Sequence, residues 1–241
     1  MSFDLPRNII MPVDAVDVRL VAEQHPFERD NRAAIVENWQ RETAANPALF
    51  DGTVVLLSEL AYRDERLTGR CHAVKYSNFM LWRKRRENSG AEHVYGHAVL
   101  VAGDNALVAI RMGPHTVNAG RVYFAAGSFE PIDFRDGLVD VDFNLIREVG
   151  EETGIDLSAA ERGRRYHMLS TPSGTVIFRR YRVVEPADEL ARRIDAFVAA
   201  EAEPEIDGPV IIRNAADLPD GLMGHMKPLI EWHFADTGEG S

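Results

Sequence analysis

The amino-acid sequence predicts an α/β fold preceded by a small α+β extension. In the second part of the chain, apolar segments of strand length alternate with amphipathic segments of helix length, which is typical of a sheet covered by helices. The first part instead contains one helical segment followed by two strands. We therefore expect residues 1–90 to form the extension and residues 91–241 to form the main domain.

The composition is that of a globular protein with a sizeable core. Hydrophobic residues make up 45% of the 241 residues, and the net charge of -11 argues against a general nucleic-acid or anionic-membrane binder. The chain contains no apolar stretch of membrane-spanning length and its start lacks a signal peptide, so we expect a soluble, cytoplasmic protein. The single cysteine, Cys71, excludes an internal disulfide and a cysteine-based zinc site.

The extension reads as a strand, a helix and an antiparallel hairpin. Apolar and polar residues alternate over residues 16–20, which predicts a half-exposed strand, and apolar residues recur at helical spacing over residues 27–43. Strands are predicted over residues 53–62 and 67–75, with residues 76–86 as a bridge to the main domain.

The bridge contains a dense basic cluster, Arg83 to Arg86. A phosphate site is one interpretation, and a solvated end of an element is the one we favour, because charge clusters rarely carry chemistry alone. His93 and His97 follow near the start of the next strand. We interpret both as structural, because a lone histidine without a partner at ligand spacing usually is.

The main domain is predicted to consist of strands with three covering helices. Gly103-Asp104-Asn105 between two apolar segments predicts a hairpin. The predicted strands are residues 97–102, 106–112, 122–126, 166–169, 175–184 and 209–213. The predicted helices are residues 143–154, 187–202 and 225–234, and residues from 236 onward are expected to fray.

The helix over residues 143–154 has an unusual distribution of charge. Its apolar face is formed by Leu145, Ile146, Val149 and Thr153. Glu148, Glu151 and Glu152 crowd the other side, where like charges three and four residues apart each cost about 0.2–0.5 kcal/mol. Gly154 is the expected helix cap, so two of these glutamates also oppose the helix dipole.

Clustered carboxylates that weaken their own helix point to a function. Violations of local stability are expected at functional sites, and oxygen donors suit Mg²⁺ or Mn²⁺. We therefore expect Glu148, Glu151 and Glu152 to bind a divalent metal. The alternative is a surface helix whose charges are simply solvated.

The segment from Arg147 to Ile155 resembles the second half of the Nudix box, R-E-U-x-E-E-x-G-U, in which U is a bulky apolar residue. All seven specified positions agree. The first half of the box departs, because its glycine would fall at Asp133 and its glutamate at Val139. Gly127 is the nearest glycine in a suitable context and lies six residues too early (133 − 127 = 6), which indicates an enlarged loop.

The sequence does not decide which residues occupy two acidic positions of the family pattern. The acid that replaces the missing first glutamate is one of Glu130, Asp133, Asp140 and Asp142, or none of them. Family members often supply a further carboxylate from a later loop, and the candidates here are Glu201, Glu203 and Glu205.

The resemblance implies a Nudix-like α/β/α sandwich around a mixed sheet and Mg²⁺-dependent hydrolysis of a nucleoside diphosphate linked to another group. In this reading Glu148, Glu151 and Glu152 bind the metal, Glu151 or a downstream glutamate acts as base, and Arg147 orients the carboxylates. Gly127 and Glu130 are expected to contact the substrate. The Thr171-Pro172 turn is similar to one in enzymes acting on nucleotide sugars and ADP-ribose.

Two other functions of the same fold are open. The first is a nucleotide-sensing module without catalysis, which the divergent first half of the box supports and the intact set of Glu148, Glu151 and Glu152 opposes. The second is an isoprenyl diphosphate isomerase, which would need a catalytic cysteine in its pocket, whereas the single cysteine, Cys71, lies in the predicted N-terminal hairpin. A zinc-containing NADH pyrophosphatase is disfavoured because it would need several cysteines to hold the zinc. We expect a small-molecule partner rather than nucleic acid or membrane, and a homodimer is compatible with the sequence.

Overall fold

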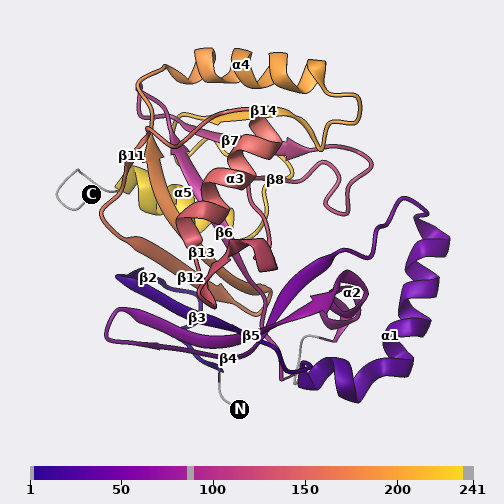
Figure 1. Cartoon of the computed structure of the whole chain (residues 1–241). Helices are drawn as coiled ribbons and strands as arrows, with labels where there is room; N and C mark the ends of the chain where they lie inside the picture. Colours follow the sequence, from indigo (N-terminus) through magenta and orange to yellow (C-terminus); the bar gives the residue numbers. More distant parts are fainter. Residues whose placement is uncertain (1–2, 86–89, 236–241) are drawn as a thin grey trace. The chain divides into compact units, whose positions relative to one another are not determined.

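The computed structural model describes residues 3–85 and 90–235. These residues form five α-helices and two β-sheets, which confirms the predicted α/β class (Figure 1). Arg86 of the basic cluster and the tail from residue 236 lie outside the described residues. No helix among those described is both long and apolar enough to cross a lipid bilayer.

The chain divides into two compact units that interleave along the sequence. The first contains Met1–Tyr95, Ser128–Val141 and Met168–Val176, and the second contains Gly96–Gly127, Asp142–His167 and Ile177–Ser241. The first unit therefore includes segments from beyond the expected N-terminal extension. The domain boundary expected at residue 90 stays a prediction.

The first unit is built on a six-stranded sheet with the order β1-β4-β5-β3-β10-β9. The long central strands pair as the predicted antiparallel hairpin, and β3 joins it in parallel. The strands are β1 (Phe3–Asp4), β3 (Ala15–Val21), β4 (Thr53–Arg63), β5 (Arg66–Lys75), β9 (Phe134–Arg135) and β10 (Leu138–Val139). The short β2 (Ile10–Val13) lies in the other sheet, next to β12 (Tyr166–Thr171).

The enlarged loop expected after Gly127 contains ordered secondary structure. A 3-10 helix, Pro131–Asp133, is capped reciprocally by Glu130 and Asp133, and the hairpin of β9 and β10 follows. Asp136 and Gly137 both have positive φ at the hairpin turn, a conformation that favours asparagine, aspartate and glycine. β10 then pairs with β3, so this loop extends the first sheet.

Two helices accompany the first sheet. α1 (Pro26–Ala45) begins where the side chain of His25 accepts a hydrogen bond from the Phe27 N–H, and it bends at Asn31 (Figure 1). The predicted bridge is itself largely helical: α2 (Tyr76–Lys84) packs against α1. Phe79 and Trp82 of α2 are buried together in a hydrophobic cluster.

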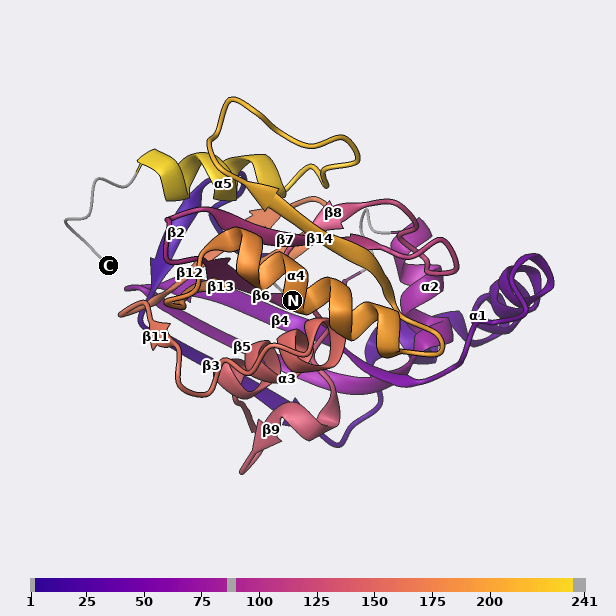
Figure 2. The ribbon, with the colours of Figure 1, turned by 90° about the horizontal axis from the view of Figure 1, so that it is seen from above.

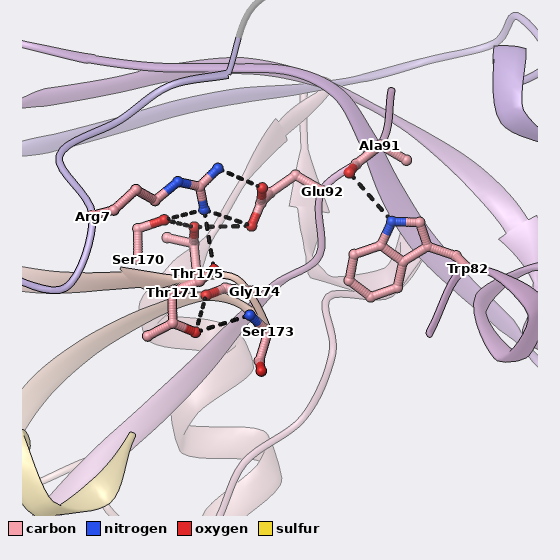
Figure 3. A network of polar contacts seen from close by, with 9 residues as sticks. All are labelled: Arg7, Trp82, Ala91, Glu92, Ser170, Thr171, Ser173, Gly174 and Thr175. Carbon is pink, nitrogen blue, oxygen red and sulfur yellow. Dashed lines mark hydrogen bonds and ion pairs between the residues drawn. The ribbon is translucent and has the colours of Figure 1, made fainter. Parts of the chain in front are cut away.

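A polar network between the exposed Arg7 and buried side chains anchors the N-terminal segment of the first unit (Figure 3). The guanidinium of Arg7 donates to the Glu92 carboxylate at 2.9 Å and to the Ser170 hydroxyl at 2.7 Å. Thr175 completes the network through Ser170 and Glu92. A proline-containing turn, Thr171 to Gly174, links β12 to β13 (Gly174–Arg182), as predicted.

The second unit is built on strands of the second sheet in the order β14-β7-β6-β13. These are β14 (Ile206–Ile212), β7 (Leu107–Met112), β6 (Val94–Val101) and the greater part of β13, and the predicted hairpin joins β6 to β7. β8 (Val122–Tyr123) pairs with β7 and is shorter than predicted, and β11 (Glu161–Arg162) pairs with β13.

Helices cover both faces of this part of the sheet. α4 (Ala187–Ala200) lies along β14 and β7 (Figure 2). Consecutive residues of a strand point to opposite faces. A side chain at Gly96 would meet Leu145 of α3 (Val141–Thr153), whereas the side chain of His97 meets His225, which directly precedes α5 (Met226–Ala235). α3 and α5 therefore lie on opposite faces, consistent with the expected α/β/α layering.

Candidate active site

The predicted acidic helix is α3, and its predicted apolar face packs as expected except at Ile146, which is only half-buried. Leu145, Val149 and Thr153 are buried. The helix ends at Gly154, whose φ of +68° is the left-handed conformation of a helix cap. A Cβ at this position would overlap the ring of Phe197 on α4, so glycine satisfies a steric requirement as well as a conformational one.

Glu152 is buried, with 6% of its surface exposed, and this corrects the expectation that it lies on an exposed acidic face. The N–H of Ala126 donates to its Oε2 at 2.9 Å. Helical spacing in fact places Glu152 beside the buried face, because it follows Leu145 by seven residues and Val149 by three (152 − 145 = 7, 152 − 149 = 3). It could not reveal that the segment of residues 122–127 packs over that side of the helix.

Glu148 lies against the same segment. A Cβ placed on Gly127 would overlap the carboxylate of Glu148, so residue 127 has no room for a side chain. The carbonyl of Gly127 accepts a hydrogen bond from the N–H of Gly96 at 3.3 Å. Residues 126 and 127 thus bring the two glutamates of consecutive helical turns together at one short stretch of backbone.

Arg147 forms ion pairs with two of the three glutamates. Its Nη2 lies 2.7 Å from Oε1 of Glu148, and both side chains are largely buried. Its Nη1 lies 2.8 Å from Oε2 of Glu151, whose side chain is 59% exposed. This arrangement fixes the orientation of Glu148 and leaves Glu151 in contact with solvent.

A fourth glutamate approaches this group. Burial raises the pKa of Glu152 well above its ordinary value, and repulsion from Glu205 and then from Glu148 raises it further. Glu205 directly precedes β14, where its carbonyl accepts a hydrogen bond from the N–H of Gly113 at 2.9 Å. Of the downstream acids that the sequence left open, Glu205 is therefore the one whose charge acts on Glu152.

The four candidates for the missing box glutamate have other surroundings. Glu130, Asp133 and Asp140 belong to the first unit, where Glu130 and Asp133 cap the 3-10 helix. Asp142, in the first turn of α3, accepts hydrogen bonds from Tyr181 at 2.5 Å and Arg179 at 2.8 Å. These contacts tie the beginning of α3 to β13. The expectation that Glu130 contacts the substrate stays a prediction.

The donor chemistry of the site fits a divalent cation. Glu148, Glu152 and Glu205 offer carboxylate oxygens, which Mg²⁺ and Mn²⁺ prefer, and a cation would relieve the repulsion that raises the pKa of Glu152. Among the residues described, no three His, Cys, Asp or Glu side chains stand ready as a metal-binding group.

Comparisons with known proteins give no family assignment. No protein-family model matches the sequence, and no curated protein matches it. The fold is similar to that of a MutT protein from Methanosarcina mazei Go1, with a TM-score of 0.41 and 15% identity over 61% of this chain and 96% of that one. It is also similar to a Nudix hydrolase from Nitrosomonas europaea, with a TM-score of 0.32 and 18% identity over 50% and 72% of the two chains.

A third solved structure, the ORF135 protein of E. coli, has a TM-score of 0.36 and 18% identity over 60% of this chain and 91% of that one. All three TM-scores lie below 0.5. The function of this chain must therefore be argued from the residues of its own site.

Proposed function

We propose that this protein is a divalent-metal-dependent pyrophosphohydrolase of the Nudix type. Its substrate would be a nucleoside diphosphate linked to another group. The observation that carries the proposal is the convergence of Glu148 and Glu152 on residues 126–127, with the charge of Glu205 acting on Glu152. The match of residues 147–155 to the second half of the Nudix box supports the same function.

Each residue of the site would have its own role in metal and substrate binding. Glu148, Glu151 and Glu152 would hold the metal, with the buried Glu152 fixed by the Ala126 N–H. Arg147 would keep the Glu148 carboxylate oriented through their ion pair, as groups beyond the ligands do in many metal sites. Gly127 would let the backbone approach the phosphates, because no side chain stands between it and Glu148.

When bound, Mg²⁺ would neutralise the charge of a pyrophosphate and activate water for in-line attack on phosphorus. The general base would be a carboxylate beside the metal ligands. Glu205 suits this role because it is exposed and its backbone is fixed by Gly113. Glu151 is the other candidate, and its carboxylate is held in an ion pair with Arg147.

The expected substrates are nucleotide sugars or ADP-ribose. The support is the Thr171-Pro172 turn, whose spacing from the box is similar to that in enzymes acting on these compounds. Nucleoside triphosphates should be poor substrates.

A nucleotide-sensing module without catalysis is the second candidate. One observation favours it: in the described ranges no group of three His, Cys, Asp or Glu side chains is arranged to hold a metal ion. Such a module would bind the nucleotide and leave it intact.

A hydrolysis screen with Mg²⁺ or Mn²⁺ separates the two candidates. The compounds are nucleotide sugars, ADP-ribose, dinucleoside polyphosphates, NADH, CoA and oxidised nucleoside triphosphates. Glu148→Gln shows whether turnover comes from this site, and Glu189→Gln on the exposed face of α4 is the matched control. Metal-dependent cleavage that Glu148→Gln abolishes and Glu189→Gln keeps supports the hydrolase. Tight binding of one compound without cleavage supports the sensing module.

A further inference from the structure

A pair of histidines lies behind the segment that meets the glutamates. Nε2 of His97 on β6 is 2.8 Å from Nε2 of His225, and the two rings stack with their centroids 5.0 Å apart. His97 is 1% exposed. Both residues belong to the second unit, and 128 residues of chain separate them.

One proton joins the two rings. A hydrogen bond between two Nε2 atoms requires that one imidazole donates and the other accepts, so at least one ring must be neutral. Burial lowers the pKa of His225 to about 4 and lowers that of His97 as well. Both rings are therefore neutral at neutral pH, and their hydrogen bond fixes a tautomer on each.

Both histidines are connected to the segment of residues 122–127, His97 through its ring and His225 through the backbone of the segment that carries it. The ring of His97 packs against the rings of Tyr123 and Phe124, and its imidazole interacts with the backbone of Phe124 and Ala125. The segment that carries His225 is hydrogen-bonded to the same strand, because the Val122 N–H donates to Gly221 and the Met223 N–H donates to Val122.

The next two residues of this segment are those that meet the glutamates: Ala126 donates to Glu152, and Gly127 lies against Glu148. We infer that His97 and His225 form a positioning couple that holds residues 122–127 in register with these two carboxylates. The consequence for metal binding rests on the proposed function. The positioning itself does not, and it can be measured in the metal-free protein.

Hydrogen–deuterium exchange of the full chain tests the positioning. His225→Phe keeps a ring but removes the nitrogen that bonds to His97, and His225→Gln keeps a polar group near the same place. The matched control is His233→Phe, because His233 is a buried histidine of α5 that contacts the carbonyl of Asn105 and not His97. Melting of each variant establishes that it is folded.

We expect His225→Phe to speed exchange of the amides of residues 122–127 at least tenfold and to weaken Mn²⁺ binding by roughly 10–100-fold, the usual effect of losing a group that supports metal ligands. His225→Gln should stay within about threefold of the wild type, since its amide can replace the imidazole hydrogen bond. His233→Phe should leave both measurements unchanged.

Wild-type exchange in a folded His225→Phe would overturn the inference. If that variant does not fold, His225→Asn supplies the same test, because its polar side chain is too short to reach His97. Glu152→Gln in the same series separates the two claims. If Glu152→Gln binds Mn²⁺ as the wild type does, the proposed function fails, while exchange still decides whether the histidines position the segment.

Discussion

The carboxylate of Glu148 occupies the space that a side chain on residue 127 would need. This contact joins the acidic helix to the loop that precedes it, and it explains why glycine is required at a position with no unusual backbone conformation. It also makes the site testable by comparing two glycines that lie near each other.

Gly127→Ala should reduce turnover on the order of 100-fold, because the new methyl group must displace Glu148 and errors of about 1 Å cost that much. Gly150→Ala is the matched control, since a Cβ there meets nothing within 4 Å. Alanine within a helix should stabilise that variant by up to about 1 kcal/mol with no loss of activity. Steady-state kinetics and thermal melts of both variants check the pair, and equal activities would show that the Gly127 contact is unimportant.

Gly154→Ala should destabilise the protein by at least about 1 kcal/mol without directly touching the carboxylates. The cost has two parts, the positive φ of +68° and the overlap of a methyl group with Phe197. Chemical denaturation measures it. An unchanged free energy of unfolding would mean that α4 shifts easily to make room for the methyl group.

The metal-free protein should lose stability relative to Glu152→Gln as pH rises above 4.5. The reasoning follows from the sign of the shift: the folded state raises the pKa of Glu152, so it keeps a proton that the unfolded chain releases from its ordinary value of 4.5 upward. Glutamine keeps the shape and cannot ionise. Denaturation of both proteins across pH, with chelator present, checks this, and parallel curves would contradict the raised pKa.

Acid should destabilise the first unit through His25. Burial lowers the pKa of His25 to about 4 from 6.5, so the stability that depends on its neutral form is complete above pH 6.5 and is lost as pH falls toward 4. The loss should be on the order of 2 kcal/mol. His25→Asn keeps a residue that caps helices well and removes the titration. Its stability should therefore change less between pH 7 and 4 than that of the wild type.

The sequence predicted the helix of the site because its evidence is local. Leu145 and Val149 repeat at helical spacing, and Gly154 provides the cap. A signal for the burial of Glu152 was present, because Glu152 follows Leu145 by seven residues and Val149 by three and so lies beside the apolar face (152 − 145 = 7, 152 − 149 = 3). Spacing does not give the segment that covers it. Glu205 was left among three candidates for the same reason: the pairing of β14 with β7 and the contact with Gly113 are long-range.

The hairpin of β9 and β10 was missed although a signal for it was present. Asp136-Gly137 is a strong turn dipeptide, but the flanking strands have two residues each, too few for an alternating pattern. His97 was interpreted as structural because its partner, His225, lies far along the chain. The sequence gives no sign of this pair, because it forms only where the fold brings β6 next to the residue that precedes α5.

The most direct test of metal binding by α3 is a titration of Mn²⁺ into the wild type, Glu148→Gln and Glu152→Gln. The free Mn²⁺ is measured by electron paramagnetic resonance. The wild type should bind Mn²⁺, and each variant should bind it at least tenfold more weakly, because each substitution removes a charged oxygen donor. Glu189→Gln should bind as the wild type does. Equal affinities in all four proteins, or no binding by the wild type, would contradict the assignment of α3 as a metal-binding helix.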